Sequence, residues 1–121
     1  MTGTPGELAA QISNAVVHYM HERLGRGPGA ARTVFADSMV VLTLQDTLTE
    51  AESYLVSTGK AETVNSARNA LRMAIRRELA SLVEDATGQR VTAVLSDQNV
   101  EVDLTVYVLL DSAKGPPISE V

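Results

Sequence analysis

Three arginines at a spacing of four form the most regular set of chemically useful side chains in this sequence. Arg68, Arg72 and Arg76 fall in a segment with helical periodicity, and the spacing places them on one helical face. Like charges four residues apart repel by roughly a few tenths of a kcal/mol unless an anion compensates them. The pattern favours a solvated or internally paired face, with an anionic ligand or acidic partner as the alternative. The candidate internal partners are Glu50, Glu52 and Asp97.

A glycine-rich loop is the second candidate site. The segment 25–29 has three glycines and one proline, and Arg26 and Arg32 accompany it. Backbone N–H groups of such loops can bind anions, but phosphate-binding loops feed a helix N-terminus, whereas this one leaves a helix and enters a strand. A helix stop and chain reversal is therefore the favoured interpretation, with Gly27 at positive φ or in close contact. The candidate ligand- or partner-binding residues are Arg26, Gly27, Pro28, Arg32, Arg68, Arg72 and Arg76.

The histidines and carboxylates give no catalytic or metal-binding pattern. His18 and Glu22 are four residues apart, but the chain has only two histidines and no His-Glu-x-x-His spacing, so surface positions are expected. Asp97 falls in an expected turn, and Glu101 and Asp103 are expected on a solvated strand face, where acidic residues serve solubility and protect an edge. We therefore expect no catalytic residues, no metal, no cofactor and no enzymatic activity.

The composition sets outer bounds on the fold and its partners. The 121 residues fit one domain, and only 3% are aromatic, so the core must be aliphatic. The absence of cysteine excludes disulfides and thiolate metal sites. No apolar run is long enough to span a bilayer and no signal peptide is evident, so we expect a cytoplasmic protein that meets membranes only through a partner. A net charge of −5 argues against nucleic-acid binding.

Local signals predict helices in the first two-thirds of the chain. Thr4 and Glu7 form a capping-box pattern, as do Thr49 and Glu52. Gly25 is expected to end the first helix. The expected elements are a helix from Thr4 to Leu24, strands over 31–36 and 39–44, a short helix to about Val56 and a long helix over 62–87.

The last third predicts a second hairpin. The expected strands are 91–95 and 100–110, joined by a turn over 96–99, and the even-numbered residues of the second strand should face the core. Residues 4–111 are expected to form one domain, and 112–121 a flexible tail. The order α-β-β-α-α-β-β predicts an α+β two-layer sandwich, with two long helices on one face of a four-stranded, mostly antiparallel sheet.

The ordered motifs resemble those of the MpsC-like family, a component of a Na⁺-translocating membrane-potential-generating system. The resemblance covers about residues 8–110 and rests on Gly25-Arg26-Gly27-Pro28, Leu48-Thr49-Glu50-Ala51-Glu52-Ser53-Tyr54-Leu55, Arg68 with Arg72, Thr87-Gly88-Gln89-Arg90-Val91, and Ser96-Asp97. It implies an accessory role beside membrane proteins that move ions or inorganic carbon. The resulting hypothesis is a non-enzymatic accessory or regulatory interaction module with a membrane transport protein as partner.

Two further expectations concern other partners. The alternative function is a small RNA-associated protein that uses Arg68, Arg72 and Arg76 as a basic stripe. A homodimer is also expected, because one sheet face cannot bury all the apolar surface, and closed twofold pairing is the commonest way to cover an exposed patch. Coverage by the C-terminal tail or the short helix is the alternative. The apolar residues expected on or near the second face are Val34, Val41, Val94, Tyr107 and Leu109.

Overall fold

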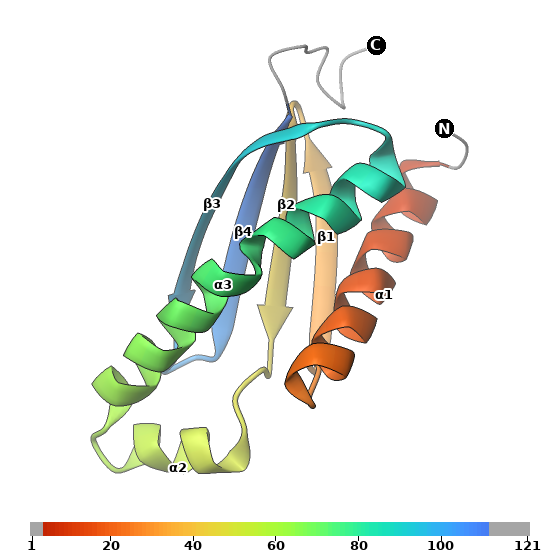
Figure 1. Cartoon of the computed structure of the whole chain (residues 1–121). Helices are drawn as coiled ribbons and strands as arrows, with labels where there is room; N and C mark the ends of the chain where they lie inside the picture. The colour runs from red at the N-terminus through yellow and green to blue at the C-terminus, as the bar shows by residue number, and fades with distance from the viewer. Residues whose placement is uncertain (1–3, 112–121) are drawn as a thin grey trace.

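Residues 4–111 fold as three helices and four strands in the predicted order (Figure 1). The computed structural model describes residues 4–111, so the expected tail over 112–121 lies outside the described residues. The elements are α1 (Pro5–Leu24), β1 (Ala30–Ala36), β2 (Met39–Gln45), α2 (Glu50–Ser57), α3 (Ala61–Thr87), β3 (Val91–Asn99) and β4 (Leu104–Asp111). No helix within residues 4–111 is long and apolar enough to cross a membrane.

Local capping fixes the helix ends where the sequence predicted them. The Thr4 hydroxyl accepts a hydrogen bond from the Glu7 backbone N–H at 3.0 Å, and the Thr4 N–H donates to the Glu7 carboxylate at 2.9 Å. Thr49 and Glu52 repeat the arrangement at the start of α2. Gly25 ends α1 with a left-handed φ of 80°, which glycine adopts without steric cost.

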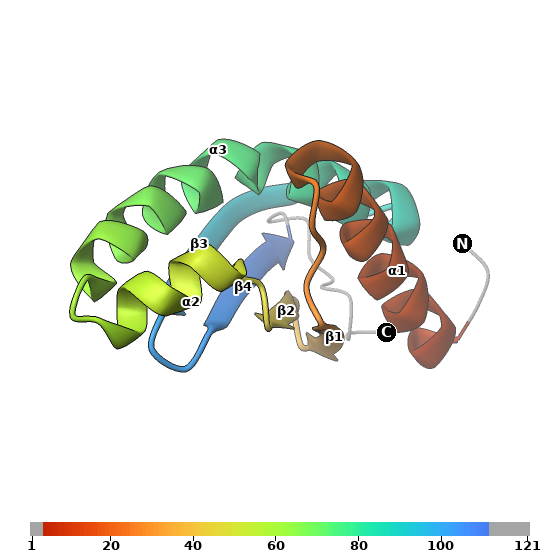
Figure 2. The ribbon, with the colours of Figure 1, turned by 90° about the horizontal axis from the view of Figure 1, so that it is seen from below.

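The four strands form one sheet in the order β1-β2-β4-β3, and every neighbouring pair is antiparallel. Figure 2 shows α1 and α3 on one side of this sheet. On that side α1 packs against β1, α3 packs against β3, and the two helices touch each other. Their shared core is aliphatic apart from one tyrosine and consists of Ile12, Val16, Met20, Val40, Leu42, Leu44, Ile75, Leu79, Ala80, Val83, Ala86, Tyr107 and Leu109.

The last hairpin differs from the prediction in its strand boundaries and in which side chains of β4 face the core. Residues 96–99 belong to β3 rather than to a turn, and the turn instead occupies 100–103. Tyr107 and Leu109 are each 1% exposed in the core, so Val106 and Val108 point to the opposite face. The predicted facing was wrong because β4 carries large apolar side chains on both faces, and alternation alone does not say which face meets the helices.

A small second core lies at the end of the sheet that carries the β3–β4 turn. Val100 packs with Leu48 and Val64, so the β3–β4 turn contacts the segment that leads into α2. Asp103 fixes this contact because its carboxylate accepts hydrogen bonds from the Thr47 N–H and hydroxyl and from the Leu48 N–H, at 2.8–3.1 Å. Asp103 was expected on a solvated strand face, but it lies in the turn with a φ of 53°. Its role is structural.

Candidate functional site

The first arginine of the predicted set is paired inside the chain. The Arg68 guanidinium donates to the Glu52 carboxylate at 2.6 and 3.0 Å and to the Thr47 carbonyl at 2.8 Å. Burial by itself would raise the pKa of Glu52, but hydrogen bonds from Arg68 and Thr49 and the Arg68 charge outweigh it and hold that pKa below its ordinary value. Arg68 therefore ties α3 to the start of α2, as one of the three predicted internal pairings.

The second arginine has a different environment. Arg72 is only 9% exposed, and it forms no salt bridge with any carboxylate of residues 4–111. One terminal nitrogen, Nη2, donates to the Asn69 side-chain oxygen. The other two nitrogens, Nε and Nη1, are buried and have no hydrogen-bond partner among the described residues. Arg72 is thus a buried cation that the described chain does not neutralise.

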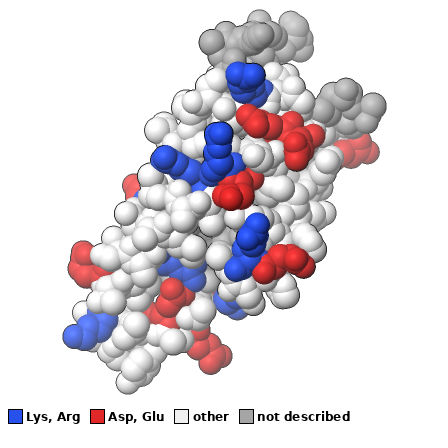
Figure 3. All heavy atoms as spheres, viewed as in Figure 1, with Lys and Arg blue, Asp and Glu red and all other residues white. Residues whose placement is uncertain are grey.

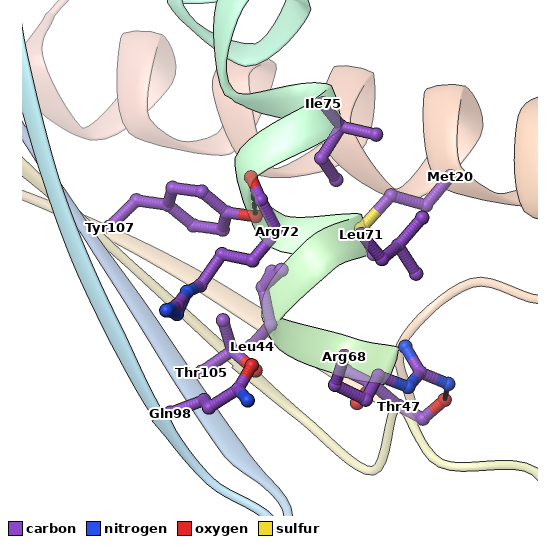
Figure 4. A pocket seen from close by; sticks show the side chains of 10 residues that line it. All are labelled: Met20, Leu44, Thr47, Arg68, Leu71, Arg72, Ile75, Gln98, Thr105 and Tyr107. Atoms are coloured by element: carbon purple, nitrogen blue, oxygen red, sulfur yellow. Dashed lines mark hydrogen bonds between the residues drawn. The ribbon is translucent and has the colours of Figure 1, made fainter. Parts of the chain in front are cut away.

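A small cavity lies between α3 and the sheet at this arginine (Figure 4). The Arg72 side chain extends toward the strands, with Gln98 and Thr105 beside its guanidinium, whereas Arg68 turns the other way, toward Thr47. The cavity volume is about 20 Å³. Its wall is partly apolar and consists of Met20, Leu44, Thr47, Arg68, Leu71, Arg72, Ile75, Gln98, Thr105 and Tyr107.

Tyr107 closes the cavity on the sheet side as a neutral donor. Its hydroxyl donates to the Arg72 carbonyl oxygen at 3.5 Å, a long hydrogen bond. Burial raises the pKa of Tyr107 well above its ordinary value of 10.0. Tyr107 therefore stays protonated at neutral pH and contributes no negative charge to offset the guanidinium.

The third arginine lies in solvent, so the three do not form one exposed stripe. Arg76 is exposed next to Arg77, above the start of β3. On the helix face, Figure 3 shows basic and acidic side chains interspersed rather than gathered into one basic patch. The three arginines lie on one helix, α3, as their spacing predicted. Packing against the sheet nevertheless gives Arg68, Arg72 and Arg76 three different environments.

The glycine loop is built as a chain reversal. Arg26 donates to the Asp46 carbonyl and carboxylate oxygens, both at 3.1 Å, and Pro28 is buried. Gly27 has no positive φ, but a Cβ there would lie 3.2 Å from the Val17 carbonyl oxygen, so the close contact accounts for glycine. These contacts hold the loop against α1 and the end of β2.

The sheet face opposite the helices carries an apolar row across all four strands. The register aligns Val34, Val41, Val108 and Leu95 side by side. A parallel row aligns Ala36, Met39, Leu110 and Ala93. Of these side chains, Val34 is 43% exposed and Leu95 is 61% exposed. We call this surface the open face; no helix of residues 4–111 covers it (Figure 2).

A row with a charged residue at each end borders the apolar rows of the open face. Across β1, β2, β4 and β3 it consists of Arg32, Thr43, Val106 and Asp97. Three strand spacings separate its ends by about 14 Å, so Arg32 and Asp97 cannot pair within one chain. The open face thus has a cation at one edge and an anion at the other, at the same height along the strands.

Sequence reasoning placed the open face only in part. Val34 and Val41 do lie on it, but Val94, Tyr107 and Leu109 belong to the core side. The missed residues are Leu95, Val106, Val108 and Leu110, together with Asp97 as the partner charge of Arg32. The signal available was the run of large apolar residues over 106–110, which marks a strand apolar on both faces. His18 and Glu22, 3.9 Å apart, are both exposed on α1.

Comparison with known proteins places the chain in a family. Residues 4–112 match the family model described as Na⁺-translocating membrane potential-generating system (MpsC). An uncharacterized protein of Bacillus subtilis (strain 168), YrhF, is 27% identical over 104 residues, which cover 84% of this chain and 85% of that protein. No solved structure matches.

Proposed function

The chain belongs to the MpsC family, and from this membership we propose that it is a non-enzymatic accessory or regulatory module of a membrane-potential-generating, Na⁺-translocating system. The family match over residues 4–112 is the observation that carries the proposal, because it spans every described helix and strand. Movement of an ion or of inorganic carbon belongs to the membrane partner in this proposal, and the present chain acts by protein contact from the cytoplasmic side.

The open face supports an interaction role. The helices of residues 4–111 leave the second face of the four-stranded sheet uncovered, and that face is apolar at its centre. Contiguous exposed apolar surface on small proteins usually marks a contact. We propose a second copy of this chain as the occupant, because the charges at the two edges of the face complement each other across a twofold axis.

The geometry of that dimer follows from the strand register. A twofold axis parallel to the strands, between β2 and β4, lays β1 over β3 of the second copy and keeps each row at its height. Val41 then meets Val108 of the other copy, and Arg32 meets Asp97 at both edges. Stacked sheets lie about 10 Å apart with their strands roughly aligned, which suits interdigitating valines and leucines.

The proposed function is tested in the cell that carries this gene. Deletion is expected to lower the Na⁺-dependent membrane potential, read with a voltage-sensitive dye in the presence and absence of Na⁺. The wild-type gene should restore it, and a Val108→Glu variant that accumulates normally should not, since it places a charge at the centre of the open face. An unchanged potential after deletion would overturn the accessory role.

The RNA alternative has no supporting arrangement among residues 4–111. It needed Arg68, Arg72 and Arg76 as one basic surface, but Arg68 is occupied by Glu52 and Arg72 is buried. Steep, salt-sensitive binding of RNA by the purified protein would support it over the accessory role.

A further inference from the structure

Arg72 has a charge that the described chain leaves uncompensated. Its guanidinium is buried against the sheet, two of its nitrogens lack partners among residues 4–111, and Asn69 offers only a neutral acceptor. Arginine stays protonated in proteins, so it cannot relieve the cost of burial by losing its proton. Removing a lone charge from water costs several kcal/mol, roughly, after relaxation. Some other group must lower this cost.

No carboxylate of residues 4–111 forms a salt bridge with Arg72. Arg68 is a cation, and the Glu52 carboxylate beside it is already hydrogen-bonded by Arg68 and Thr49. Tyr107 is neutral and donates to the Arg72 carbonyl oxygen. Glu52 is therefore committed to Arg68 and does not line the cavity, so the Arg72 guanidinium faces the cavity without an anionic partner among residues 4–111.

The size and donors of the cavity define the missing group. A cavity of about 20 Å³ exceeds the roughly 10–15 Å³ needed for one water-sized occupant and leaves no room for a phosphate or a nucleotide. A water molecule would satisfy the two N–H donors but not the charge. A small monovalent anion satisfies both, and the Thr105 hydroxyl, also in the cavity wall, is available as a further donor.

We propose that the cavity between α3 and the sheet binds one small monovalent anion of chloride size, held by Nε and Nη1 of Arg72 and by the Thr105 hydroxyl. The site joins α3 to β4, since Arg72 belongs to the helix and Thr105 to the strand. Occupancy therefore stabilises the packing of the helix layer on the sheet. This site is separate from the open face and does not depend on the proposed cellular function.

The test is chloride binding to the purified full-length protein, read by broadening of the ³⁵Cl NMR line at constant ionic strength with gluconate as the replacement anion. Wild-type protein should broaden the line, and bromide should compete. Arg72→Met removes the charge and should abolish the broadening. Arg76→Met removes an exposed arginine of the same helix and should leave it unchanged.

A crystal structure from bromide-containing solution gives the second readout, which does not depend on the folding of a variant. An anomalous bromide peak within hydrogen-bond distance of Arg72 Nε or Nη1 is expected. A water molecule in that position, with no anomalous signal, would overturn the proposal. Equal line broadening by wild type and a folded Arg72→Met would overturn it as well.

Discussion

The two faces of the sheet carry similar amounts of apolar side chain but differ in what lies against them. On the helix side, β2 and β4 bury Val40, Leu42 and Leu109 to 1% exposure or less under α1 and α3. On the open face, the neighbouring Val41 and Val108 have no helix of residues 4–111 above them. Residues 4–111 of this α+β domain thus build one finished core and one surface of core-like composition, and on that surface we propose that a second copy binds.

The faces also differ in how they treat charge. The helix side takes in Arg68 with its carboxylate and Arg72 without one, whereas the open face keeps Arg32 and Asp97 at opposite edges. A charge at an edge stays solvated until a partner arrives, so it costs little and can direct pairing. The buried charge must be compensated inside the fold. Each face therefore has a distinct electrostatic requirement.

Val40 and Val41 are neighbours on β2 but point to opposite faces of the sheet. Replacing either valine by threonine exchanges one methyl group for a hydroxyl, on the helix side at position 40 and on the open face at position 41. We expect Val40→Thr to lower the free energy of unfolding by about 1–3 kcal/mol, because the hydroxyl is buried in the core. Val41→Thr should cost less, because its hydroxyl reaches water.

Urea unfolding of both variants in a Val108→Glu background measures this difference, because the proposed dimer is not expected to form in that background. Equal losses at the two positions would mean that the open face is covered within the chain itself.

Local signals made most of the fold predictable, and nonlocal contacts limited the rest. Thr4 and Thr49 predicted the starts of α1 and α2, because both partners of a capping box lie within four residues of sequence. The facing of β4 was not predictable, because Val108 and Leu109 are equally apolar and only the position of the helices separates them. Asp103 was misjudged because its partner Thr47 is 56 residues away.

The candidate site was predictable in type but not in arrangement. The spacing of Arg68 and Arg72 gave the shared helical face, and Glu52 was one of the carboxylates expected to pair. Which arginine pairs with the Glu52 carboxylate depends on how α2 packs against α3. The spacing therefore could not show that Arg72 would be left without one.

Exchanging the charges of Arg32 and Asp97 tests whether these two residues meet across the proposed dimer. Arg32→Glu should weaken the dimer about tenfold or more, since two cation–anion contacts become two repulsions across the interface. Asp97→Arg should do the same, and the double variant should recover most of the affinity. Dissociation constants from analytical ultracentrifugation at low salt give the comparison. Additive losses in the double variant would show that the two residues do not meet.

The smallest expected effect is the loss of stability at acid pH when Glu52, which pairs with Arg68, becomes protonated. The pKa of Glu52 is lowered in the folded chain, so its contribution to stability is present above the unfolded value of 4.5 and is lost as pH falls through the folded value. The melting temperature of wild-type protein should therefore drop more steeply than that of Glu52→Gln below about pH 4.5. Parallel curves would mean that the Arg68 contact does not favour the ionised carboxylate.

Molar mass by light scattering decides whether the open face pairs with a second copy, as we propose. We expect twice the 12.9 kDa of one chain for wild type at micromolar concentration and a single chain for folded Val108→Glu. A wild-type mass of one chain across dilution would contradict it. If removal of residues 112–121 then produced a dimer, the occupant of the face would be that segment instead. A Val108→Glu variant that stayed dimeric would equally contradict the account, because the interface would lie elsewhere.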